Sequence, residues 1–426
     1  MSYYKQAMAE RSAQNGRKSC FIRCAHARLS LFVRRVDFTP LLLIFGTAVL
    51  YAVLCAICQR DALGASGYNT YTLQALAWRE GRMSLGRDYP HLELAIWGDD
   101  WWVSFPPVPS IPLYFLSFFF GSNTPDHLLV KLYVLFGCLF AYGMLRRARY
   151  DKLSAAAFSL LCSYATGLIA LSMEGAVWFQ AQTMAFMLTM GSLYFMYRGV
   201  YTPSLFLYAL AVGCRPFNAV YSLVLFVMWL ERAVKERRSM KREILRVLPG
   251  VALGLCVAAA YGWYNWARFG NPLEFGHNHL PEFSFQGGVQ FSLNHVMNNI
   301  RTFLLGAPFS YTDAGYEINK FGFSMFIVHP VFVVMLLLFI VDLCRKRLSF
   351  TKAAIIVAFA AQLFCLLLHR TFGGYQFGAR YTCDLLPYAA LYFTLPGRIH
   401  RMTVPEGLVL MASLGFAIYG ACTVLL

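Results

Sequence analysis

Six carboxylate residues lie in one polar stretch, between residues 60 and 107, of a chain that is otherwise strongly apolar. The stretch contains Asp61, Glu80, Asp88, Glu93, Asp99 and Asp100, interspersed with Trp97, Trp101 and Trp102. A positioned carboxylate can act as a general base and take a proton from an attacking hydroxyl group. Indole rings can stack on a sugar or anchor a segment at a membrane interface. The stretch is therefore either a solvated loop or the working part of an enzyme.

Glu93 is the acid that best fits a general base. It lies in the sequence HLELAI, between apolar residues and just ahead of Gly98. An apolar setting beside a membrane raises the pKa of a carboxyl group, and the carboxylate then accepts a proton more readily. Asp88 is the second candidate. Asp99 and Asp100 follow a glycine and are more typical of a turn, and an exposed loop carboxylate is the alternative for all four.

The composition indicates that a membrane domain must position these acids. Of 426 residues, 58% are hydrophobic and 14% are charged, whereas soluble domains carry about 25% charged residues. Apolar runs long enough to cross a bilayer recur from end to end, so we expect an all-α polytopic membrane protein with a single transmembrane domain over residues 38–426. The formal charge of +16 reflects basic residues clustered in short loops, which indicates membrane orientation and not nucleic-acid binding.

Basic residues indicate on which side of the membrane each loop lies. Residues 1–37 form a basic arm, which the positive-inside rule assigns to the cytoplasm. The apolar segment 108–120 is too short to cross a bilayer, and prolines surround its start, so we predict a juxtamembrane helix. If this segment does not cross, every later basic loop, including 146–152, 232–246 and 345–347, also lies in the cytoplasm.

This arrangement predicts about eleven transmembrane helices, with the C-terminus outside. The expected spans are 38–57, 128–145, 153–171, 183–197, 204–211, 220–230, 247–263, 323–341, 353–368, 385–395 and 404–426. The outer loops are then 60–127, 172–182, 265–321 and 369–384, and they contain the substantial polar segments. We therefore expect an integral, multi-pass protein of the plasma (inner) membrane, whose extracytoplasmic site acts on a lipid-linked or exported substrate.

Two arginines and one further acid outside the first loop can bind a charged substrate. Arg380 lies in the last outer loop, where a positive charge runs against the orientation rule and requires an anion, either a lipid phosphate or Asp384. Arg215 lies at a Gly-Cys-Arg-Pro break and would need a partner if it were buried. Glu174, in the loop 172–182, can hold the acceptor or a metal, or it can cap a helix.

No cofactor is assigned from the sequence with certainty, and a divalent metal is the one candidate. His277 and His279 form a His-x-His pattern beside Glu274, and such side chains can bind a divalent cation. The pattern is weak, and surface histidines are the alternative. Trp102 can stack on a sugar or anchor the loop at the membrane interface. The sequence contains no Gly-rich phosphate loop or dinucleotide fingerprint, which argues against a nucleotide-sugar donor.

The order of these segments resembles the GT-C glycosyltransferases, the class that includes polyprenyl-phosphate-sugar-dependent mannosyl- and arabinosyltransferases. One span precedes an acidic loop that ends in GDDWWVSFPPVP at 98–109, similar to the family's G..Y..fPP.P pattern. Glu174 in the next outer loop, YNWARFGNP at 264–272 and FGARY at 377–381 complete the resemblance. The commonest family pattern has an acid directly after the first span, where this chain has GYNTY at 67–71.

The resemblance covers the chain as far as Asp384 and implies both a fold and a reaction. The fold is a GT-C-like bundle with extracytoplasmic juxtamembrane helices. The reaction transfers a sugar from polyprenyl phosphate to a glycan, lipid or protein acceptor, by an inverting displacement with Glu93 or Asp88 as base. Cations must take up the charge of the departing phosphate. The substrate-binding residues that we expect are Arg380, Arg215, Glu174, His277, Tyr381 and Trp102.

A multi-pass transporter or flippase of lipid-linked or small polar substrates is the alternative function. Such proteins carry charged groups within their spans, often with broken helices and internal repeats. Here the polar residues are concentrated in outer loops, and the break at Arg215 stands alone, which favours an enzyme. An acyl- or phosphotransferase would call for a histidine-acid motif in a span or a metal-binding acid pair, and neither is evident.

Overall fold

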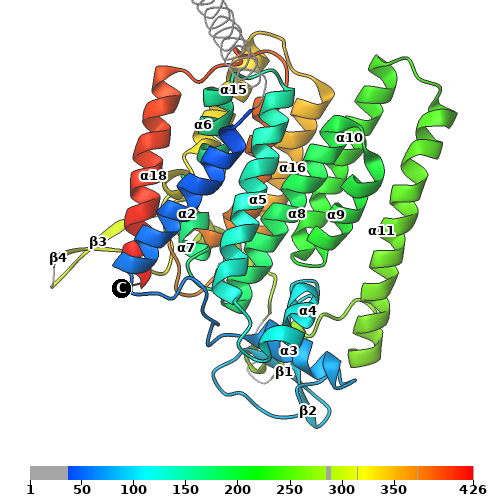
Figure 1. Cartoon of the computed structure of the whole chain (residues 1–426), viewed down its shortest axis with the longest axis vertical. Helices are drawn as coiled ribbons and strands as arrows, with labels where there is room; N and C mark the ends of the chain where they lie inside the picture. The colour runs from blue at the N-terminus through cyan, green and yellow to red at the C-terminus, as the bar shows by residue number, and fades with distance from the viewer. Residues whose placement is uncertain (1–36, 285–288, 314, 372, 426) are drawn as a thin grey trace, which may run out of the picture. The chain divides into compact units, whose positions relative to one another are not determined.

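The expected class of an all-α polytopic membrane protein is confirmed. The computed structural model describes residues 37–284, 289–313, 315–371 and 373–425, and 66% of the structure is helical (Figure 1). Six of the described helices are long and apolar enough to cross a membrane. The chain divides into two units, Met1–Phe45 and Gly46–Leu426. The described part of the first unit is the start of α2 (Thr39–Ile57), and all candidate site residues belong to the second.

Each expected span coincides in position with one helix or with a broken pair of helices, and six of the eleven contain a described helix that is long and apolar enough to cross a membrane. The unbroken ones are α2, α5 (Asp126–Arg147), α8 (Val177–Arg198), α9 (Tyr201–Val212), α11 (Met240–Phe269), α16 (Phe350–Leu367) and α18 (Val404–Leu425). Short 3₁₀ helices precede two others, so that η1 (Pro216–Val220) leads into α10 (Tyr221–Lys235) and η4 (Arg380–Leu385) leads into α17 (Leu386–Thr394).

Two expected spans are interrupted. The span expected at 153–171 consists of α6 (Lys152–Cys162) and α7 (Leu168–Leu171), and that at 323–341 consists of α14 (Met325–Val328) and α15 (Val331–Cys344). The second interruption has a local cause. Pro330 has no backbone N–H and disfavours helical geometry in the residue before it, and His329 accordingly has φ −130° and ψ 68°.

Helix α9 and the long helix α11 pack against each other through small residues. A Cβ atom added at Gly250 would lie 3.0 Å from the Cα atom of Thr202, and one at Gly254 would lie 3.7 Å from the Leu205 carbonyl oxygen. Glycines spaced four residues apart allow such close approach of helices in a membrane. Helix α11 is otherwise little covered, since only 6% of its apolar window is buried.

The loop 60–127, which is expected to lie outside the membrane, is folded into a compact module that the sequence predicted only in part. It is here named the outer-loop module, and the four loops expected on that side keep the name outer loops. The module contains α3 (Thr70–Arg79), β1 (Leu94–Trp97), β2 (Asp100–Val103) and α4 (Ser110–Phe120). Helix α4 has 11 residues and is therefore about 16 Å long, half of what a bilayer requires. This length fits the juxtamembrane helix predicted at 108–120. The Nη1 atom of Arg79 donates a 2.6 Å hydrogen bond to the Ser117 carbonyl oxygen and links α3 to α4.

A two-residue turn joins β1 to β2 and determines where Glu93 lies. Leu94 pairs with Val103 and Trp97 with Asp100 in an antiparallel register, and Gly98 has φ 61°, the left-handed geometry that glycine accepts most readily. Asp99 therefore occupies the turn, as expected, whereas Asp100 begins a strand. The hairpin places Glu93 directly before β1, and Val103 joins a buried cluster with Val177 at the start of α8. A second hairpin, β3 (Phe309–Thr312) and β4 (Gly315–Ile318), lies in the second long outer loop.

Candidate functional site

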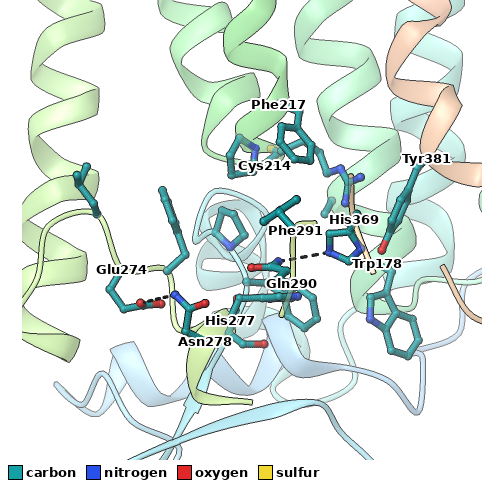
Figure 2. Close-up of a pocket in the computed structure, with 18 of the residues that line it drawn as sticks. Trp178, Cys214, Phe217, Glu274, His277, Asn278, Gln290, Phe291, His369 and Tyr381 are labelled. Atoms are coloured by element: carbon teal, nitrogen blue, oxygen red, sulfur yellow. Dashed lines mark hydrogen bonds between the residues drawn. The ribbon is translucent and has the colours of Figure 1, made fainter. Parts of the chain in front are cut away.

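Two cavities lie among the outer loops and share one tryptophan. The first, here named the carboxylate cavity, has a volume of about 460 Å³, and its lining includes Arg60, Tyr68, Glu93, Glu174, Trp178 and Arg380. The second, named the histidine cavity, has a volume of about 330 Å³, and its lining includes Tyr71, Trp178, Arg215, His277, His369 and Tyr381. In the histidine cavity, Trp178 and Tyr381 stand on one side, and Glu274 and Asn278 on the other (Figure 2).

The hairpin brings Glu93 into the carboxylate cavity but leaves Asp88 outside both cavities. The Nε1 atom of Trp178 donates a 3.0 Å hydrogen bond to Oε2 of Glu93. The Ser104 hydroxyl donates to the Glu93 carbonyl oxygen at 3.3 Å, which ties the residue before β1 to the residue after β2. Asp88 and Glu93 are both exposed, but Asp88 lines neither cavity. The two candidate bases are therefore not equivalent.

Arg380 is a buried cation at the wall of the carboxylate cavity. Only 6% of the residue is exposed, and its guanidinium carbon lies 5.0 Å from the ring centroid of Tyr381, 5.6 Å from that of Phe179 and 5.9 Å from that of Trp178. Its Nε atom is buried and has no hydrogen-bond partner among the described residues. Burial lowers the pKa of Arg380 from its usual value. A buried guanidinium in this setting is suited to an incoming anion.

The anion expected beside Arg380 belongs instead to Arg215. The Nε atom of Arg215 lies 3.0 Å from Oδ2 of Asp384, in an ion pair whose side chains are 20% and 1% exposed. Gln182 donates to the other carboxylate oxygen of Asp384 at 3.3 Å. Arg215 precedes Pro216, in the break between α9 and η1, which directs its side chain to η4. Its guanidinium carbon lies 4.7 Å from the Tyr381 ring centroid, so that one tyrosine ring contacts both arginines.

Two neutral histidines face the second cavity. The rings of His277 and His369 are 6.4 Å apart. His277 Nδ1 lies 3.4 Å from the Ser104 carbonyl oxygen, and the Gln290 amide nitrogen lies 3.3 Å from His369 Nε2 (Figure 2). Burial lowers the pKa of His369 to about 4 and also lowers that of His277. Both rings are therefore uncharged near neutral pH and act as hydrogen-bonding groups.

The metal site suggested by the His-x-His pattern does not form. Among the described residues, no group of three or more His, Cys, Asp or Glu side chains is arranged to hold a metal. The reason is that η2 (His277–His279) turns its two histidines to different neighbours. His279 packs on the rings of Trp97 at 4.4 Å and Phe269 at 5.4 Å, away from the ring of His277.

The remaining expected residues divide between cavity and scaffold. Glu174 lines the carboxylate cavity, where it accepts a 3.4 Å hydrogen bond from Ser66 and lies 4.0 Å from Nη1 of Arg60. Trp102 lines neither cavity. Its Nε1 atom donates to the Trp97 carbonyl oxygen at 3.0 Å, so it braces the hairpin.

Sequence reasoning missed several residues that line the cavities. Trp178 is the most important, because it lines both cavities and follows the expected residue Glu174 by four positions. Tyr68 lies in the stretch where the family pattern has an acid, and its ring lies 5.3 Å from that of Trp178. His369 was within an expected outer loop without being singled out. For Trp178, the only signal in the sequence was its position four residues after the candidate acid Glu174.

Comparison with known proteins identifies the fold. No protein-family model matches the chain, and no curated protein matches it. The solved structure of ArnT from Cupriavidus metallidurans, bound to undecaprenyl phosphate, aligns with 87% of this chain and 59% of its own at 15% identity and a TM-score of 0.50. The oligosaccharyltransferase from Archaeoglobus fulgidus, in its apo form, aligns with 91% of this chain and 56% of its own at 12% identity and a TM-score of 0.53.

These two structures are membrane glycosyltransferases of the GT-C type. The chain spans less than two thirds of the length of either, and the similarity at these identities concerns the fold. The described chain therefore has the GT-C fold expected from its sequence.

Proposed function

We propose that this protein transfers a sugar from a polyprenyl-phosphate donor to an acceptor at the extracytoplasmic face of the membrane. The observation that carries the proposal is the meeting of Glu93 and Arg380 in one cavity, although they lie in the first and last outer loops. One residue is suited to take a proton and the other to bind a phosphate. The GT-C fold supports the same assignment.

The chemistry is a single displacement. The acceptor hydroxyl oxygen attacks the anomeric carbon of the sugar while its proton passes to a carboxylate oxygen of Glu93. The bond between the anomeric carbon and the phosphate oxygen breaks, and the electron pair leaves with polyprenyl phosphate, so the anomeric centre is inverted. The Trp178 N–H holds Oε2 of Glu93 and leaves Oε1 available for the acceptor.

Arg380 is the proposed ligand of the lipid phosphate, with Arg215 behind it. The buried Nε of Arg380 lacks a protein partner among the described residues, whereas the Nε of Arg215 is engaged by Asp384. Arg380 can therefore accept a new anion without giving up an existing ion pair. The related fold of ArnT was solved with undecaprenyl phosphate bound, which supports a lipid phosphate as this anion.

The distribution of charge supports an extracytoplasmic site in an inner-membrane protein. The loops that join α10 to α11, α15 to α16 and α17 to α18 lie at the end of the bundle opposite the outer-loop module (Figure 1). These loops carry Arg and Lys residues at 232–246, 345–347 and 398–401. The positive-inside rule assigns this end to the cytoplasm, together with the arm of residues 1–37, of which 1–36 lie outside the described residues.

The proposal is tested with purified protein, reconstituted in lipid and supplied with polyprenyl-phosphate hexoses and pentoses and with glycan, lipid and peptide acceptors. We expect acceptor-dependent release of polyprenyl phosphate with one donor, and loss of donor binding in Arg380→Gln. Glu317→Gln, an exposed carboxylate on β4, is the matched control and should retain full activity. Movement of the labelled donor across the bilayer without formation of a glycosidic bond would instead identify a flippase.

A further inference from the structure

A third cavity is lined by residues between 237 and 246, in the segment that joins α10 to α11 and in the first turns of α11. This segment lies at the end of the helix bundle opposite α3, β1 and β2 (Figure 1). The volume of the cavity is about 380 Å³, and it is lined by Arg237, Arg238, Ser239, Arg242, Glu243 and Arg246. Here it is named the arginine cavity. Four guanidinium groups and a single carboxylate surround this space, so its electrostatic potential is strongly positive. None of these residues lines the carboxylate or histidine cavity.

The one carboxylate in the lining organises the cavity and does not neutralise it. Glu243 is completely buried. Its Oε1 atom accepts hydrogen bonds from Arg238 and Arg246, each at 2.8 Å, and its Oε2 atom accepts one from the Tyr201 hydroxyl at 2.9 Å. The guanidinium of Arg246 also lies 5.4 Å from the Tyr201 ring centroid. Both carboxylate oxygens are engaged, and Nη2 of Arg238 also forms an ion pair with Glu236. Two guanidiniums are therefore held in fixed positions, and Arg246 retains further N–H groups for a ligand.

Two more arginines of the lining are not engaged by the described protein. Arg237 and Arg242 are exposed, and neither side chain has a hydrogen bond or ion pair to another described residue. Arg237 adopts a left-handed backbone with φ 48°, which is uncommon outside glycine and reverses the chain between the two helices. Residues 232–246 include seven Lys or Arg and two Glu, so these positive charges exceed the local supply of carboxylates.

A lipid-facing surface borders the arginine cavity. Met240, Ile244, Leu245 and Leu248 lie on the first turns of α11 and are exposed by 42%, 47%, 57% and 52%. Few residues of this helix are covered by the rest of the protein, as its 6% buried window indicates. A molecule whose anionic group enters the cavity can therefore lay its acyl chains along α11. This geometry favours a phospholipid over a free phosphate ion.

We propose that the arginine cavity binds the phosphate headgroup of an anionic phospholipid in the leaflet on this side of the membrane. Arginine suits this role, because its planar N–H groups bind phosphate oxygens in pairs. Basic clusters directly beside a transmembrane helix attract anionic lipids. Orientation by positive charge alone explains why the loop is basic, but it does not require a concave site built over a buried glutamate. The proposal is independent of the transferase activity.

Native mass spectrometry of the full chain in detergent tests the proposal, with titration of phosphatidylglycerol, phosphatidylcholine and inorganic phosphate. We expect the wild type to retain phosphatidylglycerol in preference to phosphatidylcholine. The double variant Arg237→Gln/Arg242→Gln should weaken phosphatidylglycerol binding by about tenfold or more. Glu243→Gln should also weaken it, because Arg238 and Arg246 then lose their common anchor.

The matched control is Arg345→Gln/Lys346→Gln, which removes two positive charges from the exposed loop between α15 and α16. It should change phosphatidylglycerol binding by less than about twofold. Non-specific electrostatic attraction by an exposed loop is screened by salt and contributes little to binding in a specific cavity. Equal losses in the two double variants would show diffuse attraction to the surface and overturn the proposal. It would equally be overturned if the wild type bound inorganic phosphate but showed no preference for phosphatidylglycerol.

Discussion

The indole N–H of Trp178 donates a 3.0 Å hydrogen bond to the carboxylate of Glu93, a residue 85 positions earlier in the chain. This bond joins the hairpin of the first outer loop to the start of α8. It directs one oxygen of Glu93 toward the indole and leaves the other for a substrate. Trp178 also lines both cavities, so the same side chain positions the proposed base and separates the two spaces.

The first prediction distinguishes the two candidate bases. Glu93→Gln should lower the rate of sugar transfer by about 10²–10⁴-fold, the usual contribution of a general base. Asp88→Asn should remain within about twofold of wild type, because Asp88 lines neither cavity. Both rates are measured with saturating donor, and donor binding is measured separately. Glu93 would be excluded as the base if Glu93→Gln kept full activity, or if Asp88→Asn were inactive while Glu93→Gln was not.

The second prediction concerns the bond that orients Glu93. Trp178→Phe retains an aromatic ring but loses the N–H donor, and we expect kcat to fall about tenfold with little change in KM, since one hydrogen bond to a charged group contributes about 1.5–3 kcal/mol. Trp97→Phe, on the exposed edge of the same hairpin, is the control and should match wild type. A loss confined to KM in Trp178→Phe would indicate that the indole binds substrate without orienting the base.

The third prediction concerns the ion pair between Arg215 and Asp384. Removal of either partner alone should destabilise the protein by about 3–5 kcal/mol, because the other charge is left buried. The double variant Arg215→Gln/Asp384→Asn should cost less than the sum of the single variants, which thermal unfolding in detergent can measure. Arg82→Gln, which breaks an exposed ion pair with Glu80, should cost less than about 1 kcal/mol. If the double variant lost as much stability as the two single variants together, Arg215 and Asp384 would not be coupled as an ion pair.

The fourth prediction concerns the stability of the folded protein at acidic pH. Burial lowers the pKa of His369 to about 4, whereas an unfolded histidine has a pKa of about 6.5. Between these values the unfolded chain binds more protons than the folded protein, so stability falls as the pH decreases, by up to about 1.4 kcal/mol per pH unit for this group. His369→Asn should flatten the decline of Tm between pH 6.5 and 4.5. His91→Asn, at an exposed position, should leave the slope unchanged, and equal slopes in all three proteins would be the contrary result.

The fifth prediction concerns orientation. In a variant without native cysteines, an impermeant thiol reagent added from outside should label Asn123→Cys, which follows α4 in the outer-loop module. It should not label Arg149→Cys, which follows α5 in a basic loop. The reverse pattern would place both cavities in the cytoplasm and would contradict an extracytoplasmic transferase.

The helices were the most predictable part of this protein. Apolar runs of span length can satisfy their backbone groups inside a bilayer only as helices, so each expected span corresponds to a described helix or broken pair. Local chemistry also explained the short α4 and the turn at Asp99. It did not reveal the strands β1 and β2, because four-residue strands carry little periodic pattern. The break at Pro330 has a local cause, but the sequence reading treated that span as continuous.

The pairing of charged groups was less predictable. A lipid phosphate or Asp384 was expected to neutralise Arg380. Asp384 in fact pairs with Arg215, which is 169 positions distant in the sequence. The His-x-His pattern suggested metal ligands, but His279 packs on Trp97 and Phe269. Neighbouring positions in a loop do not specify a common direction for their side chains, because the loop has no regular repeat to fix one.

By itself the sequence determined that this is a polytopic helical membrane protein, because hydrophobic length and basic loops act through the bilayer whatever the tertiary contacts. It also determined that six acids gather in one polar stretch, residues 60–107, directly after the first apolar span. Only the tertiary structure decided that Glu93 and not Asp88 enters a cavity with Arg380. The reason is physical: the distance between residues 93, 178 and 380 depends on how the hairpin packs on α8 and how η4 meets the break after α9, and these contacts join segments far apart in the chain.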